Sequence, residues 1–384
     1  MKLIRLLAGA SLALAACALH TAHAAEVTVG QVAPLTGRDA GQGRAYAAGM
    51  KLAFDAANRA AGVNAGGHTF TLVSRDDAGR ADQTTRLTRD LLSEAQPLVL
   101  AGYFGGRSMT ELVASGLLEK EKIALVGYRA SEVRAETPGI YSTRARLADE
   151  IHKITDHLAT LGIARVALFH EDGPAAPALA AVTDDAAKRL KMQLTASITY
   201  PEATTRVADA VDALAKAEPQ AIIVVASGGA AARFIEQYRA AGGAAQIFVH
   251  SGADMEQVSR QIAQERSAFV SSVMQGVAIA QVTPNPYRIS SPLIKEFHDH
   301  VNRAGKLDVA VSYVMLEGYI NARVIVEAAR RQGARPTREG MAAALDRMDA
   351  FNLGGFVIGF RPGVRSGSRF VELSIISSTG KIRE

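Results

Sequence analysis

Short apolar runs and amphipathic stretches alternate along the first third of the chain. Each apolar run is bounded by turn residues, which is typical of a buried strand. Between the runs, apolar positions recur three and four residues apart, as on one face of a helix. The predicted strands cover 27–33, 68–75, 97–101 and 122–127, and the predicted helices cover 42–61, 80–94 and 108–120. Apolar strands joined by helices indicate a parallel sheet covered on both faces.

The same alternation restarts near residue 164. Further strands are predicted at 164–170, 193–200, 221–227 and 246–251, and further helices at 176–190, 205–217, 229–241, 291–305, 310–332 and 337–348. Two late segments, 354–360 and 369–377, read as paired strands. Two such runs predict an α/β protein with two doubly wound parallel-sheet domains, and 384 residues are enough for both. Ligands of open α/β sheets bind beyond the carboxyl ends of the strands, so we expect a site between the domains.

Composition and charge narrow the choice of partners. The hydrophobic content of 48% predicts a well-buried core. The formal net charge is +5, but acids and bases alternate without a basic stripe, and Trp is absent. We therefore expect no nucleic-acid partner.

The N-terminus reads as a leader for export. A basic start, MKLIR, precedes 14 apolar residues, which are too few to span a bilayer as a helix. Ala22-His23-Ala24 is an A-x-A cleavage site, so we expect a periplasmic protein whose leader, residues 1–24, is cleaved after Ala24. The alternative is a lipoprotein anchored through Cys17, because Leu14 to Cys17 fits a lipobox. Cys17 is the only cysteine, so no intramolecular disulfide can form.

The stretch GYFGGRSM, residues 102–109, allows three interpretations. A phosphate loop is disfavoured because its lysine is missing and the glycine spacing is broken. A nucleophilic Ser108 is disfavoured because the closing glycine is missing and His170 and His250 belong to the second domain. The third interpretation is a helix N-terminus that holds a carboxylate, with Ser108 as a helix cap, a ligand contact or both. We expect no cofactor.

Other residue clusters carry weaker signals. His170, Glu171, Asp172, His250 and Asp254 follow neighbouring strands, but no metal-ligand spacing is present, so we expect no metal. Arg129 follows the strand at 122–127 and is either solvated or directed at an anionic ligand group. The aromatic residues of this region either pack at the domain edge or contact ligand; they are Tyr103, Phe104 and Tyr128.

Several motifs resemble those of one family in order and spacing. They are Ala33-Pro-Leu-Thr-Gly37, Gly43, Gly49, Asn58, Gly62-Val63-Asn64, Gly67, Asp76-Asp77, Ser312 to Tyr319 and Gly354 to Phe360. Nearly all of the chain after the leader resembles the periplasmic solute-binding proteins of ABC importers, in the leucine/isoleucine/valine-binding (type I) class. The resemblance implies two lobes joined by a three-crossing hinge, with crossings near 143–147, 277–283 and 349–353. Lobe 1 would comprise 25–145 and 283–350, and lobe 2 would comprise 146–282 and 351–384.

The resemblance also implies a ligand site. In relatives a serine and a small or hydroxyl residue of lobe 1 hold the ligand carboxylate, and the matching positions are Ser108 and Ser131. Backbone groups of Gly106, Met109 and Arg129 would assist. The remaining candidates are Tyr103, Tyr128, Ser227 and, for an ammonium group, Glu171, Asp172 and Asp254. Ala175 stands where relatives carry an aromatic residue, and Arg129 where they carry a small one, so the ligand need not be a branched-chain amino acid.

The function predicted from these observations is capture without catalysis. The protein would bind a small carboxylate, an amino acid or a related organic acid, and deliver it to an ABC permease in the inner membrane. We expect a monomer that is not an enzyme. The alternatives are a periplasmic ligand sensor of the same fold and an exported serine hydrolase that uses Ser108.

Overall fold

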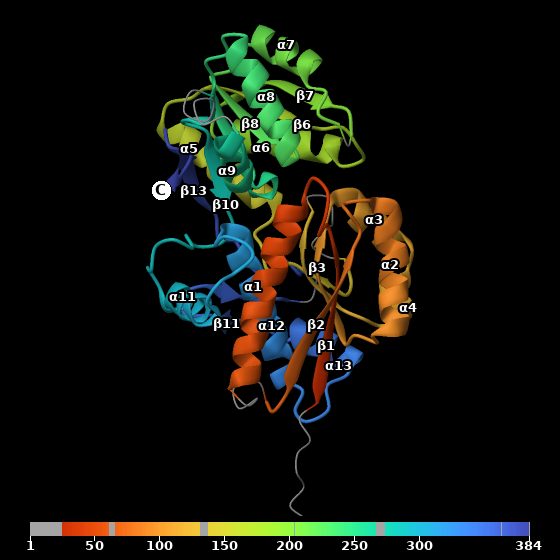
Figure 1. The fold of residues 1–384 in the computed structure, drawn as a ribbon. Coiled ribbons are helices and arrows are strands. Elements are labelled where there is room, and N and C mark those ends of the chain that lie inside the picture. Colours follow the sequence, from red (N-terminus) through yellow and green to blue (C-terminus); the bar gives the residue numbers. More distant parts are fainter. Residues whose placement is uncertain are drawn as a thin grey trace, which may run out of the picture.

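Two α/β lobes lie one above the other in a computed structural model of the chain (Figure 1). The structure describes residues 25–60, 66–130, 137–202, 204–265, 273–361 and 363–383. The predicted leader and Ser131 lie outside these residues. Within the described residues, no helix combines the length and the apolar character needed to cross a membrane.

Lobe 1 is built on a parallel sheet with the strand order β2-β1-β3-β4-β5. Its strands are β1 (Glu26–Ala33), β2 (Thr69–Asp76), β3 (Val99–Phe104), β4 (Leu125–Arg129) and β5 (Ile140–Tyr141). Its helices are α1 (Ala40–Arg59), α2 (Ala81–Glu94), α3 (Gly106–Ala114), α4 (Leu117–Lys120), α11 (Pro292–Ala304), α12 (Tyr313–Arg330) and α13 (Arg338–Asp346). Residues of α1, α11, α12 and α13 pack against one face of the sheet, and residues of α2, α3 and α4 against the other.

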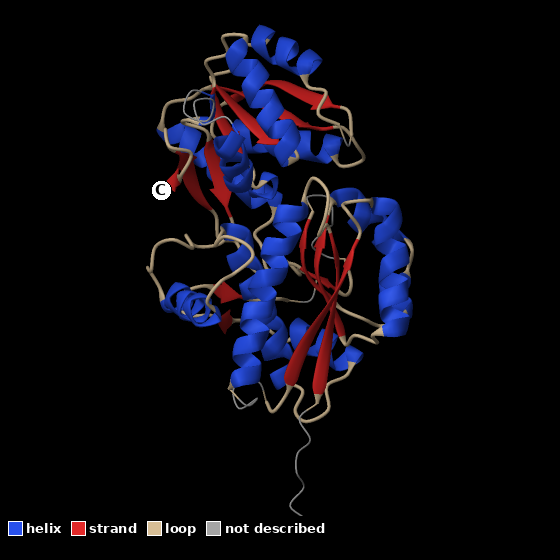
Figure 2. Cartoon of the chain, viewed as in Figure 1, coloured by secondary structure: helices blue, strands red, loops and turns tan. Residues whose placement is uncertain are grey.

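Lobe 2 has a larger sheet, with the strand order β14-β13-β10-β9-β8-β6-β7. Its strands are β6 (Arg165–Glu171), β7 (Gln193–Tyr200), β8 (Ala221–Val225), β9 (Gln246–Val249), β10 (Ala278–Gln281), β13 (Glu372–Ile376) and β14 (Ile382–Arg383). Its helices are α5 (Leu147–Thr160), α6 (Ala176–Arg189), α7 (Ala208–Lys216), α8 (Gly228–Ala240), α9 (Met255–Glu265) and the 3₁₀ turn η2 (Ser251–Ala253). Figure 2 shows helices flanking the strands in both lobes. The predicted fold class, an α/β protein with two parallel-sheet lobes, is thus confirmed.

The contact between α1 and α12 leaves no room for a side chain at two glycine positions, Gly49 and Gly318. A Cβ atom on Gly49 would lie 1.9 Å from the carbonyl oxygen of Met315, and one on Gly318 would lie 2.1 Å from that of Tyr46. Glycine at both positions therefore brings the two backbones into direct contact. The two helices, far apart in the sequence, form the centre of lobe 1 (Figure 1).

Two sequence-based predictions are wrong in detail. The predicted helix 108–120 is two helices, because Gly116 adopts a left-handed conformation (φ 66°) between α3 and α4. The segments 354–360 and 369–377 do not pair with each other. A short strand in the first, β12 (Val357–Ile358), pairs with β11 (Phe351–Asn352), whereas β13 pairs antiparallel with β10.

The chain passes between the lobes three times. The passages lie between β5 and α5, between β10 and α11, and between β12 and β13. The third passage lies after the predicted crossing at 349–353, since Leu353, Phe356 and Phe360 pack in the core of lobe 1. The first and third passages are joined, because Ser142 donates its backbone N–H to the carbonyl of Arg365 at 2.8 Å.

Candidate functional site

Ser108 lies in the first turn of α3, at the carboxyl end of the lobe 1 sheet. The helix begins after Gly105, which adopts φ 85° and occupies the N-cap position without a side-chain cap. The interpretation of Ser108 as an N-cap is therefore wrong. Ser108 is only 4% exposed, but its hydroxyl oxygen is not one of the fully buried side-chain atoms that lack a hydrogen-bond partner. A hydroxyl beside the unpaired N–H groups of a first helical turn suits an anionic ligand group.

Three other candidates of lobe 1 direct their side chains into the core. Tyr103, Met109 and Tyr128 belong to the apolar cluster between the sheet and helices α2 to α4. The Tyr103 hydroxyl lies 3.1 Å from that of Thr88, and burial raises the pKa of Tyr103. Gly106, half-buried at the start of α3, offers backbone alone.

The candidates of lobe 2 lie at the carboxyl ends of its strands. Glu171 ends β6 and is half-buried, whereas Asp172 is exposed and accepts the N–H of Gly173 at 3.0 Å. Ser227 caps α8, because its hydroxyl accepts the N–H of Ala230 at 3.4 Å. Asp254 is buried, and burial raises its pKa to about 6.

Arg129 is neither solvated nor free. Its Nη1 donates to Glu317 Oε2 of α12 at 2.5 Å, and its Nη2 donates to the carbonyl of Ser251 in lobe 2 at 3.0 Å. Its Nε donates to Gln42 Oε1 at 3.2 Å. The side chain is 4% exposed. The guanidinium therefore bridges the two lobes instead of projecting into solvent.

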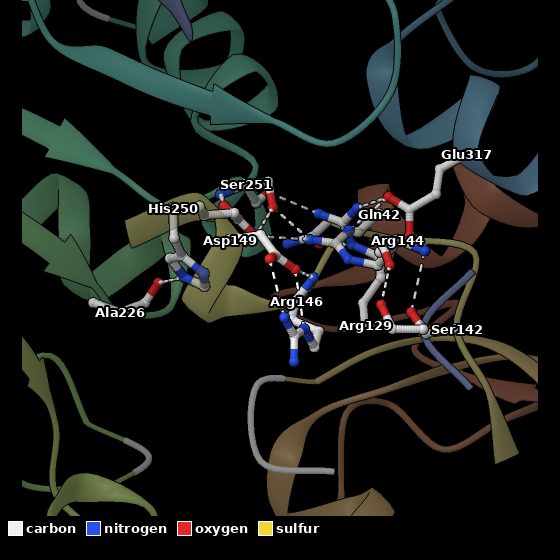
Figure 3. A network of polar contacts seen from close by, with 12 residues as sticks. Gln42, Arg129, Ser142, Arg144, Arg146, Asp149, Ala226, His250, Ser251 and Glu317 are labelled. Atoms are coloured by element: carbon white, nitrogen blue, oxygen red, sulfur yellow. Dashed lines mark hydrogen bonds and ion pairs between the residues drawn. The ribbon is translucent and has the colours of Figure 1, made fainter. Parts of the chain in front are cut away.

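A second arginine completes this interlobe network (Figure 3). Arg144, in the first passage, donates to Glu317 Oε2 at 2.6 Å and to the Ser251 hydroxyl at 2.5 Å. Glu150 of α5 lies 3.8 Å from Arg144 and accepts both the N–H and the hydroxyl of Ser251. Two arginines and two glutamates thus balance their charges in a buried position.

A small cavity adjoins this network and is lined by both lobes. Its volume is about 10 Å³, room for about one water molecule. Arg129, Tyr313 and Glu317 line it from lobe 1, and Ser251, Asp254 and Glu256 line it from lobe 2. Of the predicted site residues, the cavity thus brings together Arg129 and Asp254.

The sequence reasoning missed Arg144, Glu150, Ser251 and Glu317. Glu317 carried a signal, since it is a lone acid in the apolar helix start YVMLEGYI. An acid in such a place needs a buried cation.

The two histidines considered for catalysis or metal binding are engaged inside lobe 2. His170 contacts the Glu171 carbonyl and the Ser197 hydroxyl, and His250 contacts the Ala226 carbonyl at 3.0 Å. Burial lowers the pKa of His250 to about 4. The described residues contain no group of three or more His, Cys, Asp or Glu side chains arranged to hold a metal ion.

Comparison with known proteins places the chain in a family. Residues 26–370 match the family model described as periplasmic binding protein. The chain is similar to a substrate-binding periplasmic protein from Ralstonia solanacearum, with 32% identity and a TM-score of 0.83 over 93% of this chain and 99% of that one. No curated protein matches.

More distant structures share the fold. One is a possible leucine/isoleucine/valine-binding protein from Rhodopirellula baltica, with 21% identity and a TM-score of 0.82 over 94% of this chain and 97% of that one. Another is a solute-binding protein from R. palustris in complex with 4-hydroxybenzoate, with 18% identity and a TM-score of 0.76 over 93% and 95%. The two lobes and these matches lead to one conclusion: the chain belongs to the periplasmic binding protein family, whose members are binding proteins and not enzymes.

Proposed function

We propose that this protein captures a small carboxylate between its lobes, an amino acid or a related organic acid, and delivers it to a permease in the inner membrane. The observation that carries the proposal is the position of Ser108, in the first turn of α3 at the carboxyl end of the lobe 1 sheet. A carboxylate there would accept bonds from the hydroxyl and from first-turn N–H groups, and it would meet the positive end of the helix dipole.

Lobe 2 supports a ligand larger than a branched-chain amino acid. Small residues occupy two strand-end loops of lobe 2, at Gly173, Ala175 and Gly229. A bulky ligand group would find space beside Gly173, where an added Cβ atom meets nothing within 4 Å, but not beside Gly228, which packs against Ala253 and Val258. The complex of the R. palustris protein shows that this fold accommodates an aromatic acid, 4-hydroxybenzoate.

The role of Arg129 in ligand binding is reduced in this proposal. Its guanidinium already donates to Glu317, Ser251 and Gln42. A second carboxylate of the ligand would have to displace one of these partners. We therefore assign Arg129 to the connection between lobes, and the ligand carboxylate to Ser108.

A thermal-shift screen tests the ligand class. Amino acids, aromatic acids and dicarboxylic acids would each be added to the purified protein. A cognate ligand at 100 times its Kd should stabilise the fold by about 2.7 kcal/mol and raise the melting temperature. If sugars or cationic compounds shift the melt and no carboxylate does, the carboxylate proposal fails.

Delivery and localisation complete the proposal. We propose export with cleavage after Ala24, the alternative being a lipid anchor at Cys17, and a monomer in solution. The intact mass of the protein from its native host distinguishes an N-terminus at Ala25 from a lipidated Cys17. Loss of ligand uptake on deletion of the gene would separate transport from sensing.

A further inference from the structure

One short segment of lobe 2, residues 251–257, approaches several separate parts of the chain across the lobe boundary. The Ser251 carbonyl accepts from Arg129 at the end of β4, and the Ser251 hydroxyl accepts from Arg144 in the first passage. Glu256 Oε2 accepts the backbone N–H of Tyr313 at 3.2 Å, so this carboxylate lies at the N-terminus of α12.

The side chain of Gln257 reaches α1 at a glycine. Gln257 lies directly on Gly41, in the first turn of α1. A Cβ atom on Gly41 would be 1.3 Å from Gln257 Nε2 and 2.2 Å from its Cδ. A side chain at position 41 would therefore displace the Gln257 amide from this contact, while α1 itself could accept one on its partly exposed surface.

Ser251 is fixed within lobe 2 by a residue that contacts no ligand candidate. Its N–H donates to Glu150 Oε2 at 2.7 Å, and its hydroxyl donates to Glu150 Oε1 at 2.8 Å. Glu150 thereby orients the Ser251 hydroxyl so that its lone pair faces Arg144. Because each polar atom of Ser251 is used, the interlobe contact has a defined geometry.

We propose that residues 251–257 form an interlobe latch that sets the equilibrium between the closed and open arrangements of the lobes. Ser251 and Glu150 act as positioning residues in this latch. The closed arrangement then draws stability from contacts that lie apart from Ser108. Apparent affinity scales with the fraction of binding-competent molecules, so the latch tunes the affinity for every ligand by the same factor.

Small-angle X-ray scattering of the ligand-free protein tests the latch directly. Ser251→Ala removes the hydroxyl that joins Glu150 to Arg144, and Gly41→Leu displaces the Gln257 amide from its contact with α1. Each should lower the closed population about ten-fold or more and enlarge the radius of gyration. Matched controls are Ser374→Ala, whose hydroxyl bonds Gln281 within lobe 2, and Arg44→Leu, at an exposed site of α1.

The possible results decide the proposal. Expansion of either latch variant beyond its control, with a native circular-dichroism spectrum, supports it. If Ser251→Ala fails to fold, Gly41→Leu decides alone. The proposal is overturned if the folded variants scatter like the wild type, or if the wild type without ligand is already more open than the arrangement in Figure 1. No ligand enters this measurement, so its outcome does not depend on the carboxylate proposal.

Discussion

Replacing Glu317 by Gln tests whether the buried network is a charge-balanced unit. The Glu317 carboxylate is 3% exposed, and its Oε2 accepts from Arg129 at 2.5 Å and from Arg144 at 2.6 Å. The amide keeps the size of the side chain but leaves the two buried guanidinium groups with Glu150 and Asp254 as the remaining acids nearby. Breaking a buried pair in this way costs about 3–5 kcal/mol.

Such a loss is a large part of the total stability, since the free energy of unfolding of a domain is about 5–15 kcal/mol. Urea unfolding at pH 7 should show a lower midpoint with an unchanged slope. The matched control is Glu111→Gln, because the Arg107–Glu111 pair is exposed, with side chains 66% and 39% accessible. That change should cost only about 0.3–0.5 kcal/mol. If Glu317→Gln costs no more than the control, the network does not stabilise the fold as reasoned here.

Three further predictions concern the site, the packing and the pH dependence. Ser108→Ala should weaken binding of the screened carboxylate by about 1–3 kcal/mol in calorimetry, whereas Ser115→Ala, at the other end of α3, should not; equal effects would contradict a ligand role. Gly49→Ala should cost about 3 kcal/mol in urea unfolding, since its Cβ would lie 1.9 Å from a backbone oxygen, whereas Gly229→Ala meets only ordinary contacts and should be tolerated. Burial raises the pKa of Glu256 to about 7, so the folded state holds a proton that the unfolded state has released. Glu256 therefore lowers the free energy of unfolding as pH rises from about 5 to about 8. Glu256→Gln should reduce the dependence of the unfolding free energy on pH in this range. An identical pH dependence in the variant would refute this prediction.

The pH effect of Glu256 depends on the groups around it. Arg260 lowers its pKa, Asp254 raises it, and the N–H of Tyr313 lowers it, while desolvation is the largest cause of the rise. Tyr287 also contacts the carboxylate. The interlobe position adds a consequence for closure: if opening hydrates Glu256, acidification should favour the closed arrangement.

The alternation of apolar runs and helices was enough to predict the two lobes. The central strands β3, β4 and β8 are buried along their whole length, so their apolar character is continuous and easily recognised. The ends of individual helices are predicted less accurately from the sequence. Gly116 lies within the predicted helix 108–120 and ends α3, although a glycine inside a helical pattern is a known signal. Helix α5 was not predicted, although Ile151, Ile154 and Leu158 repeat with helical spacing and are buried.

The pairing of the last strands could not be read locally. The segments 354–360 and 369–377 are neighbours in the sequence, yet β13 pairs with β10, which lies before three helices of lobe 1. Likewise, β10 lies within the segment 277–283, for which the sequence predicts a crossing between the lobes and not a strand. A late strand pairs with a strand at the edge of an existing sheet, and the sequence next to it does not show which edge that is.

The same limit applies to the site. The helix N-terminus at Ser108 follows from a strand, a glycine turn and a helix, which are all local. The fate of Arg129 depends on Glu317 and Ser251, which lie 188 and 122 positions away. A pattern along the chain shows that an arginine ends a strand, but it cannot show which acid meets it.

The late position of β13 has a consequence for biosynthesis. β10 lacks one of its two neighbouring strands until residues 372–376 have been made, and α1 lacks its packing partner until α12 has been made. Contacts between such distant segments form slowly, and domains assemble as units. An N-terminal fragment emerging from the ribosome cannot complete either lobe. The order of segments thus delays folding until the whole chain exists, which suits a protein that we propose is threaded across a membrane before it folds.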